Sequence, residues 1–449
     1  MLRPRALNHR LLGPLVFSIF VGAIEAIAAD RPLPIDVSVL GAVELAVPEH
    51  AEHGLKLEST VTPTFKTDLP GGSRLTLVSR LRTDLWDKLE PGVADTSMRA
   101  PFNRPLYIGD KTEFELREFY WQIPLDDFYI TLGKQQIVWG TADGLKVLDV
   151  VNPQSFREFI LPEFDQSRIP LWSINIETKW HEMEVQLVLI PDQSYHQIPR
   201  AGDAFAFASP RFSGAAALAG SPVPVNLKNS QRPADKLENG DAGIKFSGFW
   251  QGWDLSLLYL YHYEDIPVVE RRFNAGVLEV TPRYERAHLL GGSFARAFGD
   301  LTLRGELGYT RGRALSVDRP MEADGVVERD VLASVIGLDW SGFDEWFVSF
   351  QLFQDRLIDD ARGLQRPRQD VTTTFYLRRR FLNDALVFES RWYANMNDGD
   401  GLGRAKLAYE LSDTVTVSFG VDWFYGEAEG VFGQFGDNDR AVLGLNFGF

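Results

Sequence analysis

The last eleven residues, Asp439 to Phe449, read "DRAVLGLNFGF". They decide between a soluble exported protein and a membrane β-barrel, the two fold classes that the rest of the chain allows. Apolar residues occupy alternate positions and fall on one face of an extended strand, namely Ala441, Leu443, Leu445, Phe447 and Phe449. On the outer strand of a soluble sheet, these side chains would promote aggregation. A closed membrane barrel has no free edge, and lipid covers its apolar outer surface. The segment therefore predicts an all-β fold, a transmembrane antiparallel β-barrel, rather than a soluble exported protein.

The same ending resembles the assembly signal of bacterial outer-membrane barrels, which is read as polar-x-Gly-x-x-apolar-x-apolar. The signal maps to Val442, Gly444, Phe447 and Phe449, and the apolar Val442 departs from it at the first position. The resemblance implies that the barrel-assembly machinery recognises the chain through Phe449.

The first 28 residues differ from the rest of the chain. Arg3, Arg5 and Arg10 precede an apolar run at 11–24, and small residues follow up to Ala28. The run is shorter than the roughly twenty residues that a spanning helix needs. This pattern predicts a secretory signal peptide at 1–28, which leaves residues 29–449 as the barrel.

The composition excludes several classes of function. The chain has 449 residues, no cysteine and a formal net charge of -16. An acidic exported chain lacks the basic surface that nucleic acid requires. The absence of cysteine excludes disulfides and a lipid-modified N-terminus. We find no catalytic or nucleotide-binding motif, and "NDGDG" at 397–401 fits a turn better than a calcium site. We therefore expect no enzyme activity, no cofactor and no metal.

Alternation with a period of two recurs along the whole chain and gives a strand count. Eight short links separate predicted strands, at 68–72, 124–127, 180–183, 251–252, 298–300, 342–345, 382–384 and 412–413. Nine longer links lie near 48–53, 88–111, 140–170, 191–238, 264–285, 311–329, 355–369, 396–402 and 426–438. These seventeen links require eighteen strands, an even number that places both ends in the periplasm. The first predicted strand, 36–47, is weakly amphipathic, but without it the count would be odd and the two ends would lie on opposite sides of the membrane. Sixteen strands are the alternative to eighteen.

Charged residues on the polar faces of these strands are candidates for the lining of the lumen. The first group is Arg80, Arg82, Glu113, Glu115 and Arg117, and the second group is Arg378, Arg380 and Arg391. Arginines that face carboxylates across an aqueous path orient charged solutes and set ion selectivity. The alternative is that these groups are paired wall residues without a role in selectivity.

One long link, 140–171, is too apolar for a surface loop. It carries Phe156, Phe159 and Phe164 at roughly helical spacing, and Asn-Pro, Leu-Pro and Ile-Pro interrupt it. An exposed apolar loop is a liability, so we predict that the segment folds into the barrel, with short helical turns, and narrows the lumen. It would then present its charged residues to the path, namely Asp143, Lys146, Asp149, Arg157, Glu158, Asp165 and Arg168. A surface lid or a subunit contact is the alternative. The loop 191–238 is predicted to be a long extracellular loop, although the sequence also allows a second insert.

The segment around this link resembles a known family. "GKQ" at 133–135, Trp139-Gly140, Asn152-Pro153 and "IPLW" at 169–172 are similar to a porin-like family of proteobacterial outer-membrane proteins of unknown function. Members are often encoded beside RND-type exporters. The resemblance implies an outer-membrane transport role and brings no established substrate.

The sequence therefore predicts a porin-like channel in the outer membrane of a Gram-negative bacterium. Small solutes would pass a lumen narrowed by the insert, and outer-membrane lipid and lipopolysaccharide would surround the barrel. The alternative is export or uptake of a lipid or hydrophobic ligand together with an inner-membrane RND-type transporter. The transported molecule and the oligomeric state are left open by the sequence.

Overall fold

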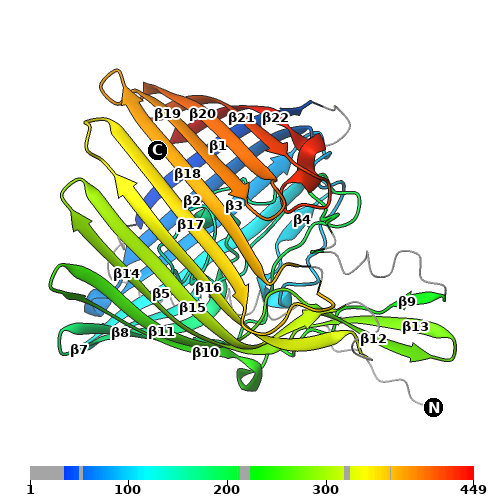
Figure 1. Cartoon of the computed structure of the whole chain (residues 1–449). Coiled ribbons are helices and arrows are strands. Elements are labelled where there is room, and N and C mark those ends of the chain that lie inside the picture. Colours follow the sequence, from blue (N-terminus) through cyan, green and yellow to red (C-terminus); the bar gives the residue numbers. More distant parts are fainter. Residues whose placement is uncertain (1–34, 50–53, 210, 213–222, 318–323, 365) are drawn as a thin grey trace, which may run out of the picture.

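The computed structural model describes residues 35–49, 54–209, 211–212, 223–317, 324–364 and 366–449. The predicted signal peptide at 1–28 lies outside these residues. The described chain forms a closed antiparallel barrel, with short turns at one end and long loops at the other (Figure 1).

Eighteen strands make up the barrel. The first nine are β1 (Ile35–Pro48), β2 (Lys56–Asp68), β3 (Arg74–Asp84), β5 (Thr112–Leu125), β6 (Phe128–Gln135), β7 (Leu171–Trp180), β8 (Met183–Ile190), β10 (Asp241–Trp250) and β11 (Trp253–Tyr263). The other nine are β14 (Arg286–Phe298), β15 (Leu301–Ser316), β16 (Val326–Trp340), β17 (Trp346–Leu357), β18 (Gln369–Phe381), β19 (Leu386–Asn395), β20 (Gly401–Ser412), β21 (Val415–Tyr425) and β22 (Arg440–Gly448). Each strand pairs with the next, and β22 closes the ring on β1, where Leu443 lies opposite Leu45. The prediction of eighteen strands is confirmed.

Among the described residues, four short strands and five short helices lie outside the barrel ladder. The strand β4 (Leu106–Ile108) pairs with one end of β5. The strands β12 (Val268–Asn274) and β13 (Val277–Arg283) form a hairpin that β9 (Val225–Leu227) extends, and the hairpin projects beyond the barrel rim (Figure 1). The sequence predicted 264–285 as a plain connection and missed this hairpin. The helices are η2 (Pro70–Gly72), η3 (Pro101–Asn103), α2 (Phe164–Ser167), η4 (Leu237–Asn239) and η5 (Gly433–Asn438). In the part of the chain that the structure describes, no helix is long and apolar enough to cross a membrane.

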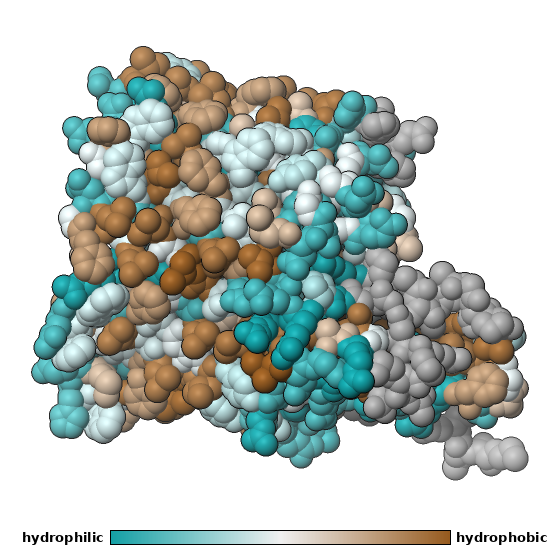
Figure 2. All heavy atoms as spheres, in the orientation of Figure 1, coloured by the Kyte–Doolittle hydropathy of each residue, from teal (hydrophilic) through white to brown (hydrophobic). Residues whose placement is uncertain are grey.

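Side chains on the two faces of the strands differ as a membrane barrel requires. On β11, the outward Leu255 and Leu257 are exposed, whereas the inward Leu258 and Leu260 are buried. Hydrophobic side chains spread over the outer wall, and hydrophilic ones gather toward the end with the long loops (Figure 2). Trp250 is also exposed, next to a short turn, where an amphipathic ring suits the membrane boundary. The alternation therefore gives the wall a lipid-facing surface.

The insert between β6 and β7 leaves the wall and packs inside the barrel, as predicted. Its helical content is smaller than the spacing of Phe156, Phe159 and Phe164 indicated. Only α2 is helical, and Phe159 has a φ of 50°, which a right-handed helix does not allow. The three phenylalanines therefore do not share one helical face.

Candidate functional site

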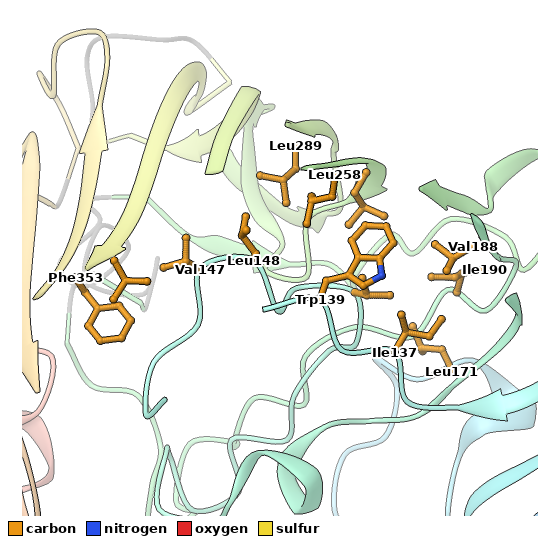
Figure 3. Close-up of a cluster of buried hydrophobic side chains, with 13 residues drawn as sticks. Ile137, Trp139, Val147, Leu148, Leu171, Val188, Ile190, Leu258, Leu289 and Phe353 are labelled. Carbon is orange, nitrogen blue, oxygen red and sulfur yellow. The ribbon is translucent and has the colours of Figure 1, made fainter. Parts of the chain in front are cut away.

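The first part of the insert, residues 136–148, runs along the inner wall and is called the first lobe here. Its apolar side chains contact inward residues of β8 to β17, and together they form one buried cluster (Figure 3). Trp139 is fully buried in the cluster, and its indole N–H donates to the side-chain oxygen of Gln186 at 2.8 Å. The apolar inner face of β11, Leu258 and Leu260, is therefore explained by contact with the first lobe. These apolar inward positions were a signal in the sequence that our face assignment did not use.

Glycines on the wall make room for the first lobe. A Cβ atom at Gly291 of β14 would lie 2.4 Å from the Cδ2 atom of Leu148. A Cβ atom at Gly243 of β10 would lie 2.5 Å from the Cη2 atom of Trp139. Both distances are well below van der Waals contact, so only glycine allows the insert to approach the wall this closely.

One wall carboxylate holds the first lobe in place. Glu306 of β15 is 3 % exposed and accepts hydrogen bonds from the backbone N–H groups of Thr141, Ala142 and Leu148, as well as from the Thr141 hydroxyl. Two residues away, Arg304 donates to the carbonyl oxygen of Thr141 and pairs with Asp143, at 2.6 Å between Nη2 and Oδ2. Hydrogen bonds to a buried charged acceptor are among the strong ones. Glu306 and Arg304 were missed as candidates in the sequence.

The second part of the insert, residues 154–165, is called the second lobe and packs on the opposite wall. Phe159 lies in an aromatic cluster, with its ring centroid 4.6 Å from that of Phe435 and 5.8 Å from that of Phe432. Phe156 contacts His196 and Phe207, residues of the loop 191–240. Part of this loop thus lies against the insert. Phe164 is outside the cluster and lies instead under the cations of Lys146 and Arg168.

A buried group of charges fastens the second lobe to the wall. Glu158 accepts from Lys56 of β2 at 2.7 Å and from Arg440 of β22 at 2.8 Å. Arg157 pairs with Glu58 at 2.7 Å. Burial raises the pKa of the Glu158 carboxyl, but Lys56, Arg440 and Arg157 outweigh this effect and hold the pKa well below its ordinary value. Glu158 therefore stays ionised at the centre of a cationic pocket.

The charges that were predicted on β3 and β5 neutralise one another. Arg80 lies 2.7 Å from Glu115, and Arg82 lies 2.5 Å from Glu113. Arg99, from the loop before β4, adds a second bond to Glu115 at 2.6 Å. The remaining member, Arg117, donates to the backbone carbonyl of Asp165. The alternative reading, paired wall residues, fits the geometry of this group better than an open lining.

The other predicted charges fall into two places. Arg168 and Lys146 both pair with Asp149, at 2.7 Å and 3.0 Å, and close the insert on itself. Arg378 and Arg380 lie on β18 and Arg391 lies on β19, strands that do not pair with β3 or β5. Arg378 lies over the Phe347 ring, and the exposed Arg380 is 3.8 Å from Asp384 at a short turn.

The insert leaves one sector of the wall less covered. The first lobe packs on β8 to β17, and the second lobe on β19 to β22 and β2. Next to the sector between them, two carboxylates of the insert remain accessible to solvent. The side chains of Asp143 and Glu163 are 61 % and 65 % exposed. Glu163 lies 4.0 Å from Arg391 of β19, and Arg391 also lies over the Tyr376 ring. Acidic groups of the insert thus face basic groups of the wall in this sector.

No grouping of three histidine, aspartate or glutamate side chains suited to a metal ion occurs among the residues that the structure describes. The carboxylates of the "NDGDG" segment have other partners. Asp398 pairs with Arg211 at 2.7 Å, and Asp400 accepts from the backbone N–H groups of Phe432 and Gly433. The segment acts as a turn and an anchor.

Comparisons with known proteins agree with this architecture. Residues 110–449 match the model of a family described as "Protein of unknown function (DUF1302)". No curated protein matches the chain. Among solved structures, the outer membrane protein opdK from Pseudomonas aeruginosa has 11 % identity and a TM-score of 0.50, over 93 % of this chain and 99 % of that chain. OccAB3 from Acinetobacter baumannii has 9 % identity and a TM-score of 0.50, over 94 % and 99 %.

These structural similarities show the fold alone, which is the porin-like barrel of outer-membrane proteins. The family match covers most of the chain and includes the insert that carried the resemblance in the sequence. The chain therefore belongs to the DUF1302 family of proteins of unknown function.

Proposed function

We propose that this protein is a channel of the outer membrane of a Gram-negative bacterium, through which small solutes diffuse past the insert 140–171. An eighteen-stranded barrel encloses a lumen too wide for its own wall side chains to fill. In this proposal the insert occupies much of this space, and solutes pass it in the sector at β17 to β19. The observation that carries the proposal is the solvent-accessible pair of Glu163 and Arg391, 4.0 Å apart, where the insert meets β19 at the edge of that sector.

Selectivity in this proposal comes from the sector rather than from β3 and β5. Arg80 and Arg82 each have a close carboxylate partner, so they add little net field to the path. Glu163, which is 65 % exposed and 4.0 Å from Arg391, places negative charge on the insert, and Arg391 places positive charge on the wall. Opposite charges on the two sides of a narrow aqueous path bias the passage of ions.

The test is the reversal potential of the protein in planar lipid bilayers under a salt gradient. The proposal expects ionic conductance, and it expects Arg391→Gln to shift the permeability ratio toward cations. Arg380→Gln is the matched control, because Arg380 lies at a short turn beside Asp384, and it is expected to leave the ratio unchanged. Folded protein without conductance would overturn the proposal. Equal ratios in all three proteins would overturn the role of Arg391.

A second candidate is passage of a lipid or hydrophobic compound, with an RND-type transporter of the inner membrane as partner. The observation that favours it is the large apolar surface of the insert. Phe159 is already covered by Phe424, Phe432 and Phe435, however, so such a compound would have to displace the second lobe. Negligible conductance together with a lipid that copurifies with the barrel would support this candidate.

A further inference from the structure

The first lobe has a short tip, residues 143–146. The residues on either side of the tip form its base, and the base has its own contacts with the wall. The base residues on either side are Thr141 with Ala142 and Val147 with Leu148. Glu306 binds the N–H groups of Thr141, Ala142 and Leu148, and Val147 and Leu148 belong to the buried apolar cluster. Within the tip, Leu145 packs against both apolar clusters and Lys146 pairs with Asp149 at 3.0 Å, so Asp143 is the tip residue whose side chain is free to move without disturbing the base.

The tip reaches across the less covered sector. The backbone of Asp143 exchanges two hydrogen bonds with the Gln351 side chain of β17, at 3.2 Å and 3.0 Å. Gly144, with a φ of 84°, lies against the ring of Tyr393 on β19, where an added Cβ atom would be 2.9 Å from Cε1. The tip thus spans from β15 and β17 to β19, over the sector assigned to passage.

The side chain of Asp143 pairs with a guanidinium, that of Arg304, which other groups hold in a fixed position. The guanidinium of Arg304 is held by the carbonyl oxygen of Thr141 and by Asp339, at 2.9 Å between Nε and Oδ2. Its Nη2 atom faces the Asp143 carboxylate at 2.6 Å. Arg304 is nearly buried, whereas Asp143 is mostly exposed. The cation is therefore fixed in the wall, and its carboxylate partner is the part that solvent and solutes can reach.

We propose that Arg304 is a binding site for a solute carboxylate, that the Asp143 side chain occupies this site at rest, and that displacement of the Asp143 side chain opens the passage beside the tip, as a gate. The inference rests on the proposed channel function and adds the solute class and the gate. A carboxylate of a small organic acid offers Nη2 the same acceptor that Asp143 offers. An ion pair with one exposed partner contributes little free energy, so a solute at moderate concentration competes with it.

The test compares single-channel open fractions in sodium chloride and in sodium acetate at equal ionic strength. Wild-type protein is expected to open more in acetate. Asp143→Asn is expected to raise the open fraction in chloride by about twofold to fivefold, because it removes the tethered carboxylate, and to lose the acetate response. Asp165→Asn is the matched control, since Asp165 is an exposed carboxylate of the same insert whose side chain forms no ion pair with the residues that the structure describes. This control is expected to behave as wild type.

The outcomes separate the inference from the function on which it rests. An open fraction in chloride that is equal in wild type and Asp143→Asn, or an equal response of the two open fractions to acetate, would overturn the proposed gate. Either result would leave the proposed channel function intact. No conductance in any folded variant would overturn the channel itself. Because Asp143 is exposed, Asp143→Asn is expected to fold normally, which heat-dependent gel migration of the barrel would verify.

Discussion

Replacement of Glu158 by glutamine tests the charge group that fastens the second lobe to the wall. Glu158 is the shared partner of Lys56 and Arg440, with Nζ and Nη1 atoms within 2.8 Å of its oxygens. The glutamine keeps the shape of the side chain and removes its charge, which leaves two buried cations facing a neutral group. Breaking a buried ion pair costs about 3–5 kcal/mol. Since the barrel ladder does not depend on Glu158, this cost falls on docking of the insert.

If docking of the second lobe becomes less favourable by about 3 kcal/mol, the undocked population rises roughly a hundredfold. Hydrogen exchange of peptides from 154–168, in detergent or liposomes, measures this population, because the amides exchange when the lobe opens. Exchange in the strand peptides is expected to stay unchanged. Glu163→Gln is the matched control, because Glu163 is exposed and lies 4.0 Å from its nearest cation, and its cost is expected to be below about 0.5 kcal/mol. Unchanged protection in Glu158→Gln, or an equal effect in the control, would refute the reasoning.

Three further predictions address packing, pH and assembly. Gly291→Ala is expected to undock the first lobe, because the added Cβ atom would overlap Leu148. The double variant Gly291→Ala with Leu148→Ala is expected to restore hydrogen-exchange protection near Trp139. A failure of this rescue would contradict the overlap. Acid is expected to weaken docking. The lowered pKa of Glu158 gives stabilisation that is present above its unfolded value of about 4.3 and is lost as the pH falls through the folded value. Burial lowers the pKa of His196 to about 3, so the unfolded state binds the extra proton below about 6.5 and stability falls with pH there as well. Exchange corrected for intrinsic rates that is equal at pH 7 and about 4.5 would disprove the His196 effect, and exchange that is equal at about pH 4.5 and about pH 2.5 would disprove the Glu158 effect. Phe449→Ala is expected to lower the fraction of folded barrel in cells, seen as heat-dependent gel migration, if the assembly machinery reads the terminal aromatic.

Much of the barrel could be predicted from local pattern. Alternation identifies a strand and its two faces without knowledge of its neighbours, because the side-chain period is two in every strand. Short polar links mark the hairpins in the same way. The prediction of a strand at the weakly amphipathic segment 36–47 was nevertheless correct, because β1 is stabilised by pairing with both β2 and β22. The hairpin β12–β13 was missed because it is a second sheet inside a loop, with strands of seven residues each.

The candidate site was only partly predictable. The sequence named Arg157 and Glu158 as charges that the insert presents to the path, whereas the structure buries both, and their partners Glu58, Lys56 and Arg440 were not named. Arg440 is 282 positions from Glu158, and no sequence period links the two. Glu306 was missed because an isolated inward glutamate on a barrel strand looks like an ordinary lumen residue. Its role depends on three backbone N–H groups more than 150 positions away.

The sequence by itself determined that the chain forms a barrel and which face of each strand meets lipid. It favoured eighteen strands over sixteen and an inward position for the segment 140–171. These properties follow from the order of polar and apolar residues along single segments. Only the tertiary structure decided which charges remain accessible. Closure of the barrel and docking of the insert pair Arg80 with Glu115 and bury Glu158, while they leave Asp143 and Glu163 exposed. The reason is physical: the inward direction of a side chain is a local property of the strand, whereas neutralisation of its charge requires a partner that the closed fold brings from elsewhere.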